Sequence, residues 1–148
     1  EKIKTALNKT DLIMFDLKTL DKDKFEQVIG GNLDLIKSNI DNINLLNKPV
    51  IARTPIIPEF NDSAEEIENI CRYLSEHLMD NLQYYELLPY HPLGAEKAVI
   101  IGKTEFSNRF SVPDKKKLNK LAEISLKFKL NVKISNKSIK DLEDTNEI

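Results

Sequence analysis

Short apolar runs alternate with amphipathic segments along almost the whole chain, and this alternation limits the fold more than any other feature. Three apolar runs, over 11–17, 49–52 and 82–88, are too short for typical helices and have the character of buried strands. The two segments between them, over 33–46 and 63–78, place apolar residues at helical spacing. Strands that alternate with helices predict right-handed βαβ units around a parallel sheet. The sequence therefore predicts an α/β fold.

The last part of the chain extends the same pattern. A helix is predicted from Pro113 to Phe128, and a short strand over 131–134. The residues after it are mostly polar, so we expect one domain over 1–134 and a polar tail over 135–148. So few parallel strands do not close a barrel, which in its full form takes about 250 residues. The pattern fits half a barrel or a small open sheet, and composition does not choose between them.

The charge balance and the cysteine content exclude several classes of protein. Lysine and arginine total 22 and aspartate and glutamate 24, for a net charge of -2, whereas broad nucleic-acid binding needs a clear basic excess. No stretch approaches the roughly 18 consecutive apolar residues of a membrane-spanning helix. Cys71 is the only cysteine and there are two histidines, so the chain cannot form an internal disulfide or a cysteine-based metal site from its own ligands. These properties predict a cytoplasmic protein that binds neither nucleic acid nor membrane.

Charged residues follow the first apolar run at the point where the predicted strand ends. In parallel α/β folds, functional residues gather at the carboxyl ends of the strands. Asp16 and Lys18 are two residues apart, so their side chains point to the same side of the strand. A carboxylate beside an ammonium group can hold a charged or zwitterionic small molecule. The alternative is a salt bridge that only closes the end of the sheet.

The other two predicted strands also end in residues that could bind a ligand. Arg53 ends the second run, before the strand breakers Pro55 and Pro58, and could clamp a carboxylate or pair with a neighbouring strand. His91 follows the third run, between a tyrosine and a proline. Its imidazole could stack on a ligand or donate a hydrogen bond to it, and the alternative is a solvated loop histidine.

Further features have plainer explanations. Cys71 falls on the apolar stripe of its helix and is expected in the core, and His77 lies near a helix C-terminus, where the helix dipole favours it. Gly30 and Gly31 follow a short helical pattern and are expected to form a C-cap rather than a phosphate-binding loop. The lysines over 115–117 open an amphipathic helix and are expected on its solvated face.

Three segments occur in one order, each about one strand–helix unit after the last. They are Asp11-Leu-Ile-Met-Phe-Asp16-Leu-Lys18, Arg53-Thr-Pro-Ile-Ile-Pro58-Glu-Phe-Asn61-Asp62 and Glu86-Leu-Leu-Pro89-Tyr90-His91-Pro-Leu-Gly94. Over roughly residues 8–134, the sequence resembles the C-terminal half of the glycyl-radical-enzyme activating enzymes. These form the radical S-adenosylmethionine group typified by pyruvate formate-lyase activating enzyme.

The resemblance implies a fold and an activity. The fold would be an incomplete (β/α)6 TIM-like barrel, of which residues 1–134 supply the C-terminal half, with the last three strands and their helices. The full enzyme would be an oxidoreductase that reductively cleaves S-adenosylmethionine at a [4Fe–4S] cluster. It would generate a glycyl radical on a partner enzyme similar to pyruvate formate-lyase. Its electron donor would be a flavodoxin or a ferredoxin.

The resemblance also implies roles for particular residues. Asp16, Lys18 and His91 match positions that contact S-adenosylmethionine in the family, and Arg53 matches an arginine that lines the barrel. The Asp16 carboxylate and the backbone carbonyl of Met14 match ligands of a monovalent cation beside the cofactor carboxylate. These roles agree with the charges of the residues, because a carboxylate with several cations suits the amino-acid end of the cofactor.

The sequence departs from the family pattern in its iron–sulfur motif. Family members bind the cluster through C-x-x-x-C-x-x-C, and this motif, the Gly-Gly-Glu motif and the aspartate of the third strand are all absent. The chain therefore has no iron–sulfur ligands and no catalytic residue of its own, and we expect it to be inactive alone. The missing parts would precede Glu1, which is not a methionine, so the chain is expected to be a piece of a longer enzyme.

The missing half would have one structural consequence, and two alternative functions remain open. The first strand would present an open edge, so we expect the chain to self-associate through it or to have it covered by a partner. One alternative function is a stand-alone, non-catalytic interaction module with a half-barrel fold. The other is an unrelated barrel lyase that uses Lys18 as a Schiff-base nucleophile, which the neighbouring Asp16 disfavours because it keeps the lysine charged.

Overall fold

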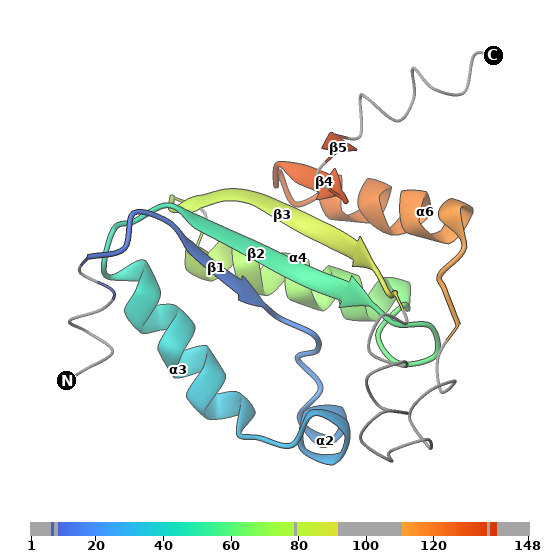
Figure 1. The fold of residues 1–148 in the computed structure, drawn as a ribbon, viewed down its shortest axis with the longest axis horizontal. Coiled ribbons are helices and arrows are strands. Elements are labelled where there is room, and N and C mark those ends of the chain that lie inside the picture. The colour runs from blue at the N-terminus through green and yellow to red at the C-terminus, as the bar shows by residue number, and fades with distance from the viewer. Residues whose placement is uncertain (1–6, 8, 79, 92–110, 136, 139–148) are drawn as a thin grey trace, which may run out of the picture.

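A single twisted sheet forms the centre of the computed structural model, which describes residues 7, 9–78, 80–91, 111–135 and 137–138 (Figure 1). Its strand order is β1-β2-β3-β4-β5. The first four strands are parallel to their neighbours, and β5 pairs antiparallel with β4. The strands are β1 (Ile13–Asp16), β2 (Val50–Ile56), β3 (Leu82–Pro89), β4 (Val132–Ile134) and β5 (Lys137–Ser138).

Helices connect the parallel strands and cover one face of the sheet. In Figure 1, α4 passes behind the sheet, and α3 and α6 lie to either side of it. The helices are α2 (Lys22–Lys24), the single π-helical turn η1 (Phe25–Ile29), α3 (Leu33–Asn44), α4 (Ala64–Leu78) and α6 (Lys115–Leu126). The alternation in the sequence therefore predicted the α/β class and the parallel sheet correctly.

Local sequence signals fix the ends of these helices. The side chain of Asn32 accepts a hydrogen bond from the Leu35 amide (2.9 Å) and caps α3. The Ser63 hydroxyl accepts one from the Glu66 amide (3.1 Å) at the start of α4. Gly30 adopts a left-handed conformation (φ 72°) and donates to the Phe25 carbonyl (3.0 Å), so the predicted C-cap is confirmed.

Pro55 does not break the second strand, contrary to the sequence prediction. β2 continues to Ile56, and Pro55 lies opposite Leu88 of β3. In a parallel strand, alternate residues direct their backbone groups to opposite neighbours, and Arg53 accepts from Leu17 on the β1 side. Pro55 faces that same side, beyond the last residue of β1, so its missing N–H removes no bond from the ladder.

The lysine run at the start of α6 is also more than a solvated face. Lys117 forms an ion pair with Asp62, a buried carboxylate in the loop that joins β2 to α4. The Asp62 side chain also accepts from the Glu59 amide (3.0 Å), where the backbone is left-handed (φ 66°). This ion pair therefore ties the loop after β2 to α6.

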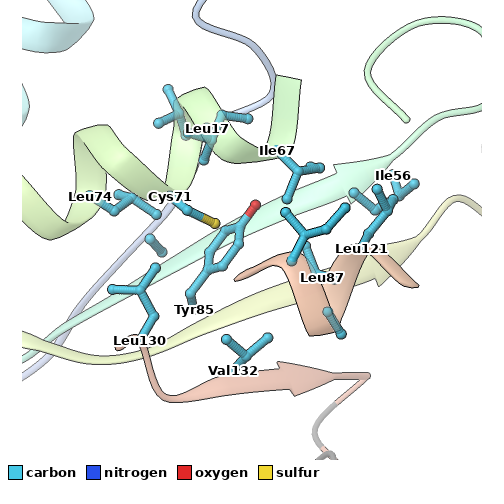
Figure 2. Close-up of a cluster of buried hydrophobic side chains, with 14 of the residues drawn as sticks. Leu17, Ile56, Ile67, Cys71, Leu74, Tyr85, Leu87, Leu121, Leu130 and Val132 are labelled. Atoms are coloured by element: carbon cyan, nitrogen blue, oxygen red, sulfur yellow. The ribbon is translucent and has the colours of Figure 1, made fainter. Parts of the chain in front are cut away.

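The hydrophobic core lies between the sheet and the helices, as Figure 2 shows. Tyr85 is fully buried among aliphatic side chains, and its hydroxyl donates to the Thr54 hydroxyl (2.8 Å). Cys71 is buried in the same cluster, which confirms its predicted core position, and burial raises the pKa of its thiol to about 11. On the outside of α4, His77 contacts Asp41 of α3 (Nδ1 to Oδ1, 2.7 Å). No helix in the described ranges is long and apolar enough to cross a lipid bilayer.

The face of the sheet opposite the helices carries a different set of side chains. In β1, Ile13 is buried toward the helices, whereas Met14 and Asp16 are exposed on the other face. The same alternation in β2 places Thr54 in the core and Arg53 on the open face. The charged residues Asp16 and Arg53 therefore lie on the open face, at the carboxyl ends of their strands.

Candidate functional site

Four charged residues form a row across the open face of the sheet. Asp16 of β1 is in register with Arg53 of β2, Arg53 with Glu86 of β3, and Glu86 with Lys133 of β4. Side chains in register on adjacent parallel strands lie on the same face. The row thus alternates in sign from one strand to the next, which favours each neighbouring pair.

The Asp16 carboxylate is the centre of the row's first part. Its Oδ1 accepts from Arg53 Nε (3.0 Å) and lies 2.9 Å from Nη2, and its Oδ2 lies 3.5 Å from Lys18 Nζ. All three side chains are about one-third exposed. Asp16 and Lys18 therefore share one side, as strand alternation predicted, and they form a salt bridge. Asp16 thus pairs with two cations, and Glu86, in register with Arg53, adds a second carboxylate to the row.

Glu86 and Lys133 are members of the row for which the sequence suggested no role. Glu86 is only 3% exposed although it lies on the open face. The Lys133 ammonium lies 3.9 Å from the centre of the Tyr84 ring, within the range of a cation–π contact. The available signal was a charged residue inside an apolar run, but its neighbours depend on strand register, which the sequence does not encode locally.

His91 lies at the same end of the sheet but outside the ion pairs of Asp16. The Tyr90 amide donates to the Ile56 carbonyl (3.1 Å), which fixes the chain as it leaves β3. His91 follows directly and is exposed. The remainder of its predicted loop, residues 92–94, lies outside the described residues.

The backbone of Met14 faces the side of β1 that has no strand neighbour among the described residues. The Ile13 amide donates to the Pro49 carbonyl (3.0 Å) and the Leu17 amide to the Arg53 carbonyl (2.8 Å), so the odd-numbered residues face β2. The carbonyls of Met14 and Asp16 therefore face away from β2. Carbonyl and carboxylate oxygens suit a hard cation. In the described part of the chain, no group of three or more His, Cys, Asp or Glu side chains could hold a metal ion.

The segment that follows β1 is anchored to α4 by a buried carboxylate. Glu66 Oε1 accepts from the Thr19 hydroxyl (2.7 Å) and from the Leu20 amide (3.1 Å). Its Oε2 forms an ion pair with Lys24 (3.3 Å). The partners of Glu66 lie more than 40 positions away in the chain, so local sequence patterns do not reveal this contact.

Two hollows of about 390 and 440 Å³ lie beside the N-terminal end of α4, one against Leu20 and Lys24 and the other against Lys117 and Lys120. Neither is lined by residues of the row. A ligand at the row would therefore be held by charge on one side of the sheet and not by enclosure within these residues.

Comparison with known proteins shows which proteins the chain is similar to. No family model matches the chain. It is 35% identical over 119 residues to a 4-hydroxyphenylacetate decarboxylase activating enzyme of Clostridioides difficile, covering 78% of this chain and 36% of that protein. It is 35% identical over 100 residues to an isethionate sulfite-lyase activating enzyme of Oleidesulfovibrio alaskensis, covering 66% and 31%. A pyruvate formate-lyase-activating enzyme of Staphylococcus aureus is 29% identical over 93 residues.

A solved structure shares the fold. A domain of a pyruvate-formate lyase-activating enzyme from Bacteroides vulgatus superposes with a TM-score of 0.73, over 90% of this chain and 73% of that one, at 19% identity. The likeness decides between half a barrel and an open sheet, in favour of the partial barrel. The chain spans about a third of the length of the curated relatives named above. It is a homologue of the glycyl-radical-enzyme activating enzymes over part of their length.

Proposed function

We propose that this chain provides part of the S-adenosylmethionine site of a radical activating enzyme, at the charged carboxyl ends of β1 and β2. The enzyme would be an oxidoreductase that cleaves S-adenosylmethionine reductively and generates a glycyl radical on a partner enzyme. One observation carries the proposal: Asp16 is held between Arg53 and Lys18 on the open face of the sheet. The homology to activating enzymes supports the general role.

The charges of the site suit the amino-acid end of S-adenosylmethionine. That end carries one carboxylate and one ammonium group. Lys18 and Arg53 can bind the ligand carboxylate, while Asp16 accepts from its ammonium group. His91 would contact the cofactor from the loop after β3.

In this proposal a monovalent cation would lie beside the site. The Met14 carbonyl faces the side of β1 away from β2, on the strand that also carries the Asp16 carboxylate. We assign these two oxygens as the ligands that this chain would supply. The cation would add positive charge next to the cofactor carboxylate.

The [4Fe–4S] cluster does not fit the residues of this chain. Such clusters are held by several cysteine thiolates, and the sequence has one cysteine, Cys71, whose raised pKa and full burial oppose ligation. In the proposal, the cluster ligands lie outside these 148 residues, and this chain alone is inactive. The partners would be a glycyl-radical enzyme similar to pyruvate formate-lyase and a flavodoxin or ferredoxin as electron donor, in the cytoplasm.

Calorimetric titration of the purified chain with S-adenosylmethionine tests the proposal. Asp16→Ala and Lys18→Ala should each weaken binding by about tenfold or more, since each removes a charge-assisted contact. Lys22→Ala is the matched control: it removes the same charge as Lys18→Ala, from an exposed pair with Asp34 (3.3 Å) away from the row. Equal affinities in all three variants would show that the residues are assigned wrongly.

A second candidate function rests on the edge of β1. In the described residues β1 has β2 as its one strand neighbour, and Leu12 and Met14 beside the edge are 44% and 46% exposed. An open parallel edge with exposed apolar side chains favours pairing with another strand. The chain would then act as a non-catalytic interaction module, or as a self-associating one.

Light scattering and amide hydrogen exchange test this second candidate. The amides of Ile13 and Leu17 already donate to β2, so only those of Met14 and Asp16 report on the edge. A dimer in which these two amides are protected supports pairing there. A monomer in which they exchange freely contradicts it.

A further inference from the structure

The hydrogen-bond ladder between β1 and β2 ends just before Lys18, one of the residues of the proposed site. The last backbone bond between β1 and β2 runs from the Leu17 amide to the Arg53 carbonyl (2.8 Å). Lys18 is the next residue, and its ammonium must stay beside Asp16 to act with it. Because β1 is an edge strand in the described sheet, no strand on its other side holds Lys18 in place.

Beyond the last backbone bond between β1 and β2, the side chain of Asn61 links the two chain segments. Its Nδ2 donates to the Lys18 carbonyl (2.7 Å) and to the Pro55 carbonyl (2.9 Å), and its Oδ1 accepts from the Ile57 amide (2.7 Å). Asn61 is fully buried. The carbonyl of Pro55 faces the space that β1 has vacated, so one amide group bridges the gap between the two diverging chains.

The chemistry of these three bonds calls for an amide. The side chain must donate twice and accept once in a buried space, and asparagine supplies two N–H donors and one carbonyl oxygen. A serine has one donor, and an ionised aspartate has none. The contacts therefore use the asparagine side chain almost to its full capacity.

Asn61 is itself held from two directions. Its amide donates to the Ile57 carbonyl (3.2 Å) in the tight turn after β2. The next residue, Asp62, pairs with Lys117 of α6. The position of Asn61 is therefore set by β2 and α6. Through its hydrogen bond to the Lys18 carbonyl, Asn61 in turn holds the backbone of Lys18 in place.

We propose that Asn61 is a positioning residue that fixes Lys18 beside Asp16 for ligand binding. The ligand half of this inference rests on the proposed function, whereas the positioning half concerns the chain alone. The competing explanation is that Asn61 only adds stability to the loop. A variant of Thr54 distinguishes the two explanations, because the buried Thr54 hydroxyl also donates to the end of β1, at the Leu17 carbonyl (2.7 Å).

Thr54→Val is accordingly the matched control for Asn61→Ala. Both variants remove a hydrogen bond to the end of β1, and Thr54→Val also removes the acceptor of the Tyr85 hydroxyl, so both destabilise the fold. In Thr54→Val, however, Leu17 keeps its backbone bond to Arg53, and Lys18 keeps its bond to Asn61. Only Asn61→Ala should loosen Lys18. Asn61→Ser, which keeps one short donor, replaces it in the comparison if the alanine variant does not fold.

Nitrogen-15 relaxation of the 148-residue chain tests the positioning half without any ligand. The order parameter of the Lys18 amide should be about 0.85 in the unmodified chain and in Thr54→Val, and should fall toward about 0.6 in Asn61→Ala. An order parameter at Lys18 that stays high in the Asn61 variant would overturn the inference.

Titration with S-adenosylmethionine tests the ligand half on the same samples. Its affinity should fall about tenfold in Asn61→Ala and change little in Thr54→Val, because displacing a binding group weakens its contact. Equal losses in both variants would reduce Asn61 to a stabilising residue. If the unmodified chain binds no S-adenosylmethionine, the proposed function fails, while the relaxation result still decides whether Asn61 holds Lys18.

Discussion

Replacing Glu66 should reveal how strongly the segment after β1 is anchored. The Glu66 side chain is buried, and its Oε1 accepts from both the Thr19 hydroxyl (2.7 Å) and the Leu20 amide (3.1 Å). Glu66→Ala leaves both donors without this acceptor. Glu66→Gln keeps a carbonyl oxygen in nearly the same place but loses the ion pair to Lys24.

The structure sets different magnitudes for the two variants. A buried donor left without a partner costs about 1–3 kcal/mol, and Thr19 is fully buried while Leu20 is only partly so. We expect Glu66→Ala to lower the free energy of unfolding by about 2–4 kcal/mol. The Lys24 side chain is 40% exposed, so its ion pair is worth less than about 1 kcal/mol. Glu66→Gln should therefore cost about 1 kcal/mol.

Urea unfolding followed by far-ultraviolet circular dichroism measures both values, since the chain has no tryptophan to serve as a fluorescence probe. Glu65→Ala is the control, because Glu65 is exposed in the same first turn of α4 and has the same charge. Equal costs for the alanine and glutamine variants would refute the assignment of Oε1 as the anchor. A cost of Glu66→Ala no larger than that of Glu65→Ala would refute the anchor altogether.

Other consequences of burial can be checked in the same samples. Cys71 has its thiol pKa raised to about 11, so Ellman's reagent should react with it at neutral pH only as fast as the chain unfolds, and rapid native-state labelling would contradict the buried position. Burial, with a contribution from Asp41, raises the pKa of Tyr73 to about 12. The folded chain then keeps a proton that the unfolded chain releases near pH ~10, so stability should fall between about pH 10 and 12, and less so in Tyr73→Phe. Tyr85→Phe removes the bond to Thr54 and should cost about 1 kcal/mol in urea unfolding, and no measurable loss would contradict that bond.

The fold was predictable because its signals are local. Apolar runs and helical spacing located the parallel strands of the described sheet and the helices α3, α4 and α6, and Gly30 marked the end of η1. The error at Pro55 arose because a proline is harmless in a strand whose neighbour has ended, and the sequence does not show where β1 ends relative to β2. Strand β5 was also not predicted. It falls within the predicted polar tail, and its antiparallel pairing with β4 is not visible in local sequence patterns.

The candidate site was predictable only in part. Strand alternation correctly placed Asp16 and Lys18 on one side. The pairing of Asp16 with Arg53 and the place of Glu86 in the row depend on the register of separate strands, which local patterns do not fix. The hydrogen bond from Asn61 to Lys18 spans 43 positions, so local sequence patterns did not reveal it. Long-range polar contacts thus account for most of what the sequence left out.

A two-dimensional nitrogen–proton NMR titration of the chain with S-adenosylmethionine tests the central claim most directly, because it locates the ligand residue by residue. We expect saturable shifts that are largest at Asp16, Lys18 and Arg53 and extend to His91, with none at Lys22. Shifts confined to the hollow beside Lys120, or no saturable shift at any residue, would contradict it.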